Sequence, residues 1–149
     1  SVSDESQDPD YEKVRNWVRE EKYEKALDVL ESKTQAQPQS GTPVILKGMV
    51  LIEQGNYKEA LRALMEGQQR ELRHPALHFG FCQVYRHLGQ ADPSERACHI
   101  TVQQHPGAPE THYELAQTLA ARGKMRQAAK ALKKAIDLNP EDPQYPYEL

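Results

Sequence analysis

Apolar and polar residues follow one another along the chain with the 3.6-residue period of α-helices. A first apolar stripe consists of Tyr11, Val14, Trp17 and Val18. After a short polar break, a second stripe consists of Tyr23, Ala26, Leu27 and Leu30. The pattern predicts pairs of short amphipathic helices joined by tight turns.

The turns recur at a fixed interval. Gly55, Gly89 and Gly123 stand 34 residues apart, each just after a predicted first helix. At such a position the chain enters the left-handed region, which glycine occupies without steric cost. A period of this length predicts a stacked array of helical hairpins, in windows 7–40, 41–74, 75–108 and 109–142.

The last window carries a motif that resembles a known family. Its matching positions are His112, Leu115, Ala116, Leu119, Gly123, Ala128, Leu132, Ala135 and Pro140. They are similar to the pattern of tetratricopeptide repeats, and the segment from Gly55 to Leu61 looks like the family's central turn. The resemblance implies an all-α fold, an α-solenoid of antiparallel helix hairpins that winds as a right-handed superhelix.

The resemblance also implies a domain organisation. Residues 1–8 are expected to be a flexible leader, and repeat one to be an atypical, cap-like unit with Glu21 where later repeats have glycine. Residues 143–149 resemble the start of a fifth, truncated repeat. We expect either that the segment belongs to a longer protein, or that a partner or second copy covers the last apolar stripe: Ala128, Ala131, Leu132, Ala135 and Ile136.

Small residues recur at two further positions of the windows. Gly48, Cys82 and Ala116 share one position, and Ala60, Ser94 and Ala128 share the other. In tetratricopeptide repeats these two positions face each other where the helices of a hairpin cross.

Composition narrows the class of protein. Of the 149 residues 28 % are charged, and the net charge of −3 gives no general attraction to nucleic acid. The longest apolar run, 43–52, is too short to span a membrane and contains Lys47. Two cysteines are too few for the disulfide framework of a small secreted protein. The sequence does not decide the cellular compartment, and we favour the cytoplasm slightly over the periplasm.

No motif for catalysis or cofactor binding is present: the chain has no nucleotide loop, nucleophile elbow, kinase signature or zincin motif. His74, His78 and Cys82 are spaced like ligands on one helix face, with Cys98 and His99 in the facing helix. However, His74 precedes a proline and so lies in a loop. We therefore expect no metal site, and buried free thiols rather than a disulfide at the two cysteines.

Tetratricopeptide arrays commonly receive a peptide or helix on the concave side formed by their first helices. By window position the groove would be lined by Tyr11, Arg15, Arg19, Ile45, Leu46, Met49, Ile52, Phe79, Gln83, Arg86, Tyr113 and Gln117. The Lys/Asn/Arg clamp that one subfamily uses for acidic C-terminal tails is absent. Its places carry Tyr11, Arg15, Leu46, Ala76 and Gly80.

An apolar patch in this predicted groove consists of Ile45, Leu46, Met49 and Ile52. It is bordered by Arg15, Arg19 and Arg86. Contiguous exposed apolar surface marks an interaction site, although neighbouring helices could instead bury part of it, Leu46 and Met49 especially. We expect a non-enzymatic scaffold for a protein or peptide partner, and Ile45→Asp or Met49→Asp to abolish binding without loss of helicity. Self-association and a docking role within a larger enzyme are the alternatives.

Overall fold

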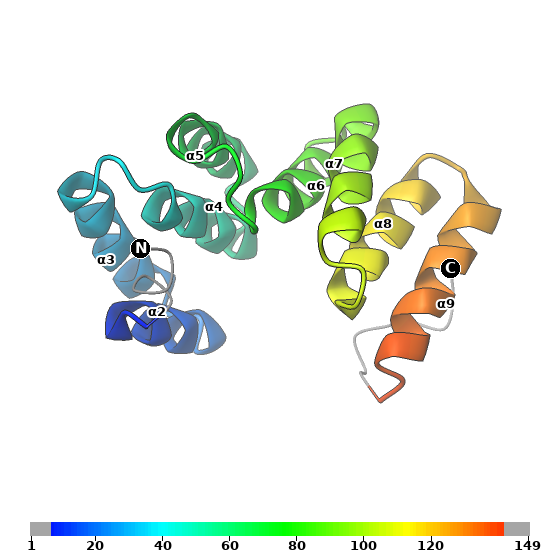
Figure 1. Cartoon of the computed structure of the whole chain (residues 1–149), viewed down its shortest axis with the longest axis horizontal. Coiled ribbons are helices and arrows are strands. Elements are labelled where there is room, and N and C mark those ends of the chain that lie inside the picture. Colours follow the sequence, from blue (N-terminus) through cyan, green and yellow to red (C-terminus); the bar gives the residue numbers. More distant parts are fainter. Residues whose placement is uncertain (1–6, 142–149) are drawn as a thin grey trace. The chain divides into compact units, whose positions relative to one another are not determined.

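The computed structural model describes residues 7–141, which form eight α-helices and no strand (Figure 1). The helices are α2 (Pro9–Arg19), α3 (Tyr23–Ala36), α4 (Thr42–Gln54), α5 (Tyr57–Arg70), α6 (Leu77–His87), α7 (Ala91–Gln104), α8 (Pro109–Ala121) and α9 (Met125–Leu138). Each of the four windows therefore contains two helices. Most of the expected leader, and the segment 143–149 assigned to a fifth repeat, lie outside the described residues.

Local chemistry sets where the helices begin and end. Asp8 caps α2 by accepting a hydrogen bond from the backbone N–H of Asp10 at 2.9 Å, and Pro9 occupies the first turn. At the turn after α6, Gly89 has a φ of 76°, and the next N–H donates back to the Tyr85 carbonyl at 2.8 Å. Glu21, at the equivalent place in the first hairpin, adopts the same left-handed region with a φ of 58°.

The chain divides into two compact units, Ser1–Gly80 and Phe81–Leu149, with the boundary inside α6. In the first unit α2, α3, α4 and α5 pack in sequence order. One core cluster comprises Tyr11, Val14, Ala26, Leu30 and Val50, and Trp17 packs against it. Trp17 is therefore part of the hairpin core.

Helices in this unit approach each other closely where one of them has a glycine. A Cβ at Gly48 would lie 3.0 Å from the Leu64 side chain and 3.3 Å from the Ala60 carbonyl oxygen. The small-residue positions of the repeat therefore meet at the crossing of α4 and α5, as the resemblance implies. Gly67 of α5 lies directly against Ile45, where a side chain would collide with it.

The second unit contains the remainder of α6 with α7, α8 and α9. Its core includes Leu115, Leu119 and Leu132, together with small side chains from α8 and α9. The Phe81 and Tyr85 rings stack along α6, with centroids 5.6 Å apart. Among the described residues, no helix is both long and apolar enough to cross a membrane.

Candidate functional site

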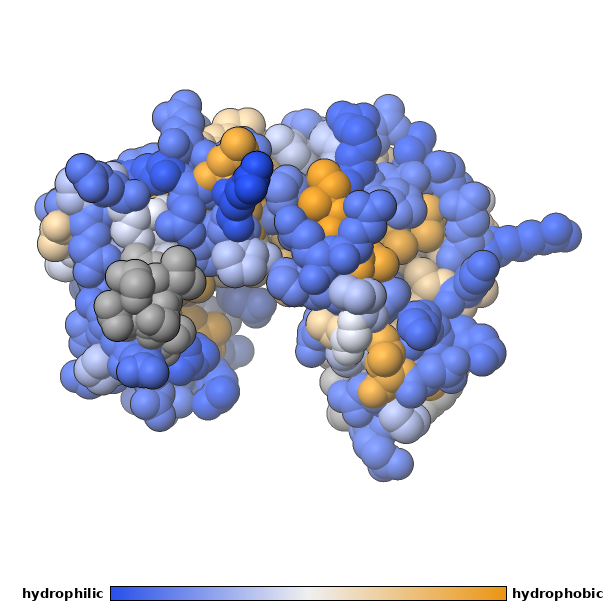
Figure 2. Space-filling model, viewed as in Figure 1, coloured by the Kyte–Doolittle hydropathy of each residue, from blue (hydrophilic) through white to orange (hydrophobic). Residues whose placement is uncertain are grey.

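A hollow of about 330 Å³ lies between α2 and α4 in the first unit. We call it the α2/α4 hollow; it is lined by Val14, Arg15, Val18, Arg19, Leu46, Met49, Val50 and Glu53. Val14 and Val50 are buried, whereas Val18, Leu46 and Met49 are half-buried and present apolar surface. On the face drawn in Figure 2, hydrophilic side chains predominate and hydrophobic ones form small, separate patches.

Charged groups border the apolar part of the α2/α4 hollow. Arg15, Arg19 and Glu53 are all exposed. Arg19 donates from Nη1 to Asn16 Oδ1 at 3.0 Å. Neither Arg15 nor Glu53 has an ion-pair partner among residues 7–141. The hollow thus offers an apolar contact next to two guanidinium groups.

The structure brings only part of the predicted groove to this place. Arg15, Arg19, Leu46 and Met49 line the α2/α4 hollow together. Ile45 is 0 % exposed, because Gly67 lets α5 approach it closely, and Ile52 is buried as well. The expectation that these two isoleucines face a ligand is therefore wrong. Leu46 and Met49 stay accessible, although the sequence pattern indicated them as the residues that neighbouring helices could bury.

Tyr11 also belongs to the core rather than to an open groove. Its side chain is buried, and the Lys33 ammonium lies 5.3 Å from the centre of its ring. Lys33 in turn pairs with Asp8 at 2.6 Å. Phe79, Tyr113 and Gln117 are half-buried and do not line the α2/α4 hollow.

Arg86 and Gln83 hold a carboxylate of their own unit. Arg86 Nη2 lies 2.8 Å from Glu114 Oε2, and Gln83 Nε2 donates to Glu114 Oε1 at 3.2 Å. The Glu114 side chain is only 11 % exposed. Arg86, expected to border the groove as a cation, is therefore largely neutralised by an internal partner.

The apolar stripe assigned to self-association is mostly covered. Ala128, Ala131, Leu132 and Ala135 are buried, and only Ile136 is half-buried. The prediction that α9 presents a wide bare stripe is wrong, because α8 packs along most of it.

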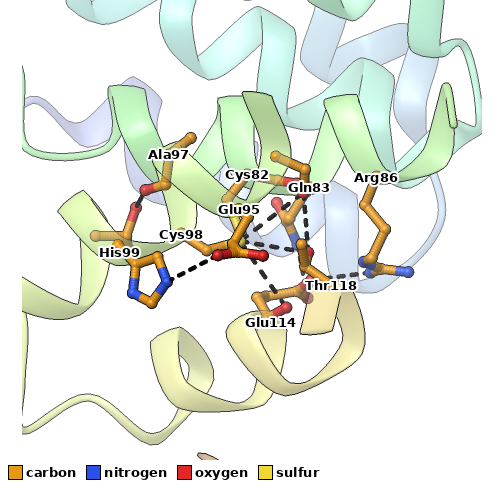
Figure 3. The surroundings of a disulfide bond; sticks show 11 residues. Cys82, Gln83, Arg86, Glu95, Ala97, Cys98, His99, Glu114 and Thr118 are labelled. Atoms are coloured by element: carbon orange, nitrogen blue, oxygen red, sulfur yellow. Dashed lines mark hydrogen bonds and ion pairs between the residues drawn. A yellow bond between two sulfur atoms is a disulfide. The ribbon is translucent and has the colours of Figure 1, made fainter. Parts of the chain in front are cut away.

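The two cysteines form a disulfide, contrary to the expected free thiols (Figure 3). Cys82 in α6 and Cys98 in α7 have Cα atoms 4.8 Å apart, and both residues are 0 % exposed. The Ser94 hydroxyl donates to the Cys82 carbonyl at 2.7 Å and lies 2.9 Å from the Thr118 hydroxyl.

A sequence signal for this disulfide was present. Cys82 occupies the small-residue position of Gly48, and Cys98 occupies the position of Leu64, whose side chain contacts the Gly48 site. Two cysteines at a pair of positions already known to touch are placed to bond. The bond also removes both thiolates as metal ligands, and residues 7–141 contain no group of three metal-ligating side chains.

The histidines have structural partners. His74 lies in the loop before α6, where its Nε2 is 3.1 Å from Thr42 Oγ1 and its Nδ1 accepts from the Ala76 N–H. His112 Nε2 lies 2.7 Å from the Pro106 carbonyl oxygen.

Comparisons with known proteins agree with the fold. A family model described as "Tetratricopeptide repeat" matches residues 101–145. A search of the curated proteins gives no match.

Several solved structures resemble the chain. TTC0263, a thermophilic TPR protein of Thermus thermophilus, is 20 % identical, with a TM-score of 0.78 over 95 % of this chain and 79 % of that one. YrrB, described as a TPR protein with an unusual peptide-binding site, is 25 % identical, with a TM-score of 0.70 over 89 % and 68 %. The first TPR of Spaghetti (RPAP3), bound to the HSP90 peptide SRMEEVD, is 21 % identical, with a TM-score of 0.64 over 70 % and 83 %.

Proposed function

We propose that the chain is a non-enzymatic tetratricopeptide scaffold whose α2/α4 hollow binds a peptide or amphipathic helix of a partner protein. The observation that carries the proposal is the meeting of accessible Leu46 and Met49 with the exposed Arg15 at one hollow. The titles of the YrrB and RPAP3 structures describe peptide binding by those proteins, and here they support the class of ligand alone.

The apolar part of the hollow fits a protruding side chain. Its volume of about 330 Å³ is at the lower end of the range for ligand sites. Met49 has an unbranched, polarizable side chain that adapts to differently shaped partners. An aliphatic or aromatic residue of the partner would therefore enter between α2 and α4.

The arginines at the hollow favour particular residues next to the partner's apolar side chain. Arg15 and Arg19 are one helical turn apart on α2, and guanidinium groups bind carboxylates in a paired geometry. We therefore expect an acidic residue next to the apolar anchor. The missing Lys/Asn/Arg clamp makes a C-terminal carboxylate an unsuitable anchor, so the ligand should be an internal segment.

The test is a peptide library displayed on phage and selected on the full chain. Met49→Asp places a charge in the floor of the hollow, and Met65→Asp is the matched control, because Met65 is 45 % exposed on α5 outside the hollow. Selected peptides should carry an apolar residue beside Asp or Glu. Burial of one large apolar side chain contributes about 1.5–3 kcal/mol, so Met49→Asp should weaken binding at least tenfold.

The control variant should bind like the wild type, and circular dichroism at 222 nm should be the same for all three proteins. Arg15→Glu should weaken the acidic peptides further. Peptides that bind Met49→Asp as tightly as the wild type, or a library with no enrichment, would show that this hollow is not the site.

A further inference from the structure

A second and larger hollow lies in the other unit, over α8 and between α7 and α9. Its volume is about 470 Å³. We call it the α8/α9 hollow; it is lined by His99, His112, Leu115, Leu119, Gln127, Lys130, Ala131, Lys133, Lys134 and Asp137.

The floor of the α8/α9 hollow is apolar. Leu115 and Leu119 of α8 meet Ala131 of α9 there. Position 117 lies about 200° around the helix from position 115, so the hollow uses the side of α8 opposite to the predicted groove residue Gln117. This surface is therefore distinct from the concave face that the family resemblance points to.

The rim of the hollow is basic in an acidic protein. Helix α9 contains four cations and one acidic residue, a net charge of +3, whereas the whole chain carries −3. Lys133 pairs with Asp137 at 3.0 Å. Lys130 and Lys134 have no ion-pair partner among the described residues, and both are exposed.

The Glu95 carboxylate of α7 lies 3.4 Å from Nε2 of His99, which lines the hollow, and also pairs with two cations near the start of α9. Glu95 lies 3.0 Å from Lys124 and 2.9 Å from Arg122. Burial raises the pKa of Glu95, but these two cations outweigh the burial and hold the pKa below its usual value. Glu95 therefore stays ionised and neutralises cations near the start of α9, which leaves Lys130 and Lys134 without a counter-charge.

We propose that the α8/α9 hollow docks an acidic, amphipathic peptide segment of a second partner protein. An apolar side chain of that segment enters between α8 and α9, and two of its carboxylates pair with Lys130 and Lys134. The two lysines are spaced i, i+4, so the carboxylates need a separation of about 6 Å, which acidic residues one helical turn apart provide.

Peptides fit this surface better than other polyanions. A phosphate backbone would use the lysines but leave the apolar floor without a contact, and the negative net charge of the chain opposes it. A membrane surface would require protruding apolar residues, whereas Leu115, Leu119 and Ala131 are buried at the base of a hollow.

The experiment uses the full chain labelled with ¹⁵N and a synthetic helical peptide with leucines at i and i+4 and glutamates around them. One control peptide has glutamine for each glutamate, and a second has serine for each leucine. Lys130→Glu with Lys134→Glu is the test variant. Lys25→Glu with Lys58→Glu is its control, because it changes the net charge equally on exposed sites outside both hollows.

We expect the acidic peptide to shift the amide signals of α8 and α9 and to bind about tenfold more weakly to the test variant at 50 mM salt. The control variant and Met49→Asp should leave unchanged the affinity measured from the α8 and α9 signals, so this result is independent of binding at the α2/α4 hollow. Both control peptides should bind weakly.

Three results would overturn the proposal. Shifts confined to α2 and α4 would place the peptide at the other hollow. Equal losses in both double variants would reveal general charge attraction. Binding of phosphatidylglycerol vesicles or oligo(dT) that depends on Lys130 and Lys134, without peptide binding, would assign the surface to a different kind of anion.

Discussion

Loss of the Cys82–Cys98 disulfide should lower the free energy of unfolding by about 3 kcal/mol. The two cysteines are 16 residues apart in sequence, and in the chain-entropy account a cross-link that closes a loop of this length restricts the unfolded state by about that amount. Both residues are fully buried, so the bond should resist reductant in the native protein. We therefore expect reduction only after unfolding.

The assay is urea unfolding followed by circular dichroism, for oxidised protein and for protein unfolded, reduced with TCEP and refolded. Cys82→Ala with Cys98→Leu is the control, because it installs the residue types of Ala116 and Leu132 at the same repeat positions. Its unfolding midpoint should not respond to TCEP. Uptake of two iodoacetamide groups by the native protein without reductant, or coincident oxidised and reduced midpoints, would refute the reasoning.

Three further changes probe the scaffold. Glu21→Gly should raise the free energy of unfolding by about 0.5–1 kcal/mol in urea titrations, because relief of left-handed strain outweighs the larger loss of backbone freedom that glycine suffers on folding. Ile45→Asp should lose its helical signal under native conditions, since it buries an unpaired carboxylate. The hydrogen bond from Lys33 lowers the pKa of Asp8, so that pair stabilises the fold above about pH 4 and loses its effect below it. Asp8→Asn keeps a capping side chain and should flatten this acid limb in unfolding measured from pH 5 to pH 2.

The period of the chain predicted the fold because each helix pair repeats one local pattern. The turn glycines and the small crossing residues depend on neighbours within a single hairpin, and the structure places them as the pattern requires. Information of this kind lies within about 34 residues of sequence. It is sufficient to assign the repeat and its helices.

The candidate site was less predictable because the exposure of each groove residue depends on which side chain packs against it from the neighbouring helix. Ile45 holds a position assigned to the groove, but Gly67 across from it has no side chain, and α5 therefore covers the isoleucine. Arg86 meets Glu114, a partner 28 residues away that window positions alone do not identify. Pattern positions give the face of a helix, and only the packed neighbours decide what remains accessible.

In both hollows, charged groups are expected to set the association rate and apolar contacts the dissociation rate. In each, an apolar floor lies beside exposed cations that have no ion-pair partner among residues 7–141. Exposed charges act over about 10 Å at 0.1 M salt and mainly speed the encounter with an oppositely charged partner, whereas apolar contacts form only on docking. Higher salt should therefore slow association with acidic peptides and leave dissociation nearly constant. Met49→Asp should instead accelerate dissociation from the α2/α4 hollow, and stopped-flow fluorescence resolves the two rates. If salt changed only the dissociation rate, the arginines and lysines would act on the bound complex alone and not on the encounter.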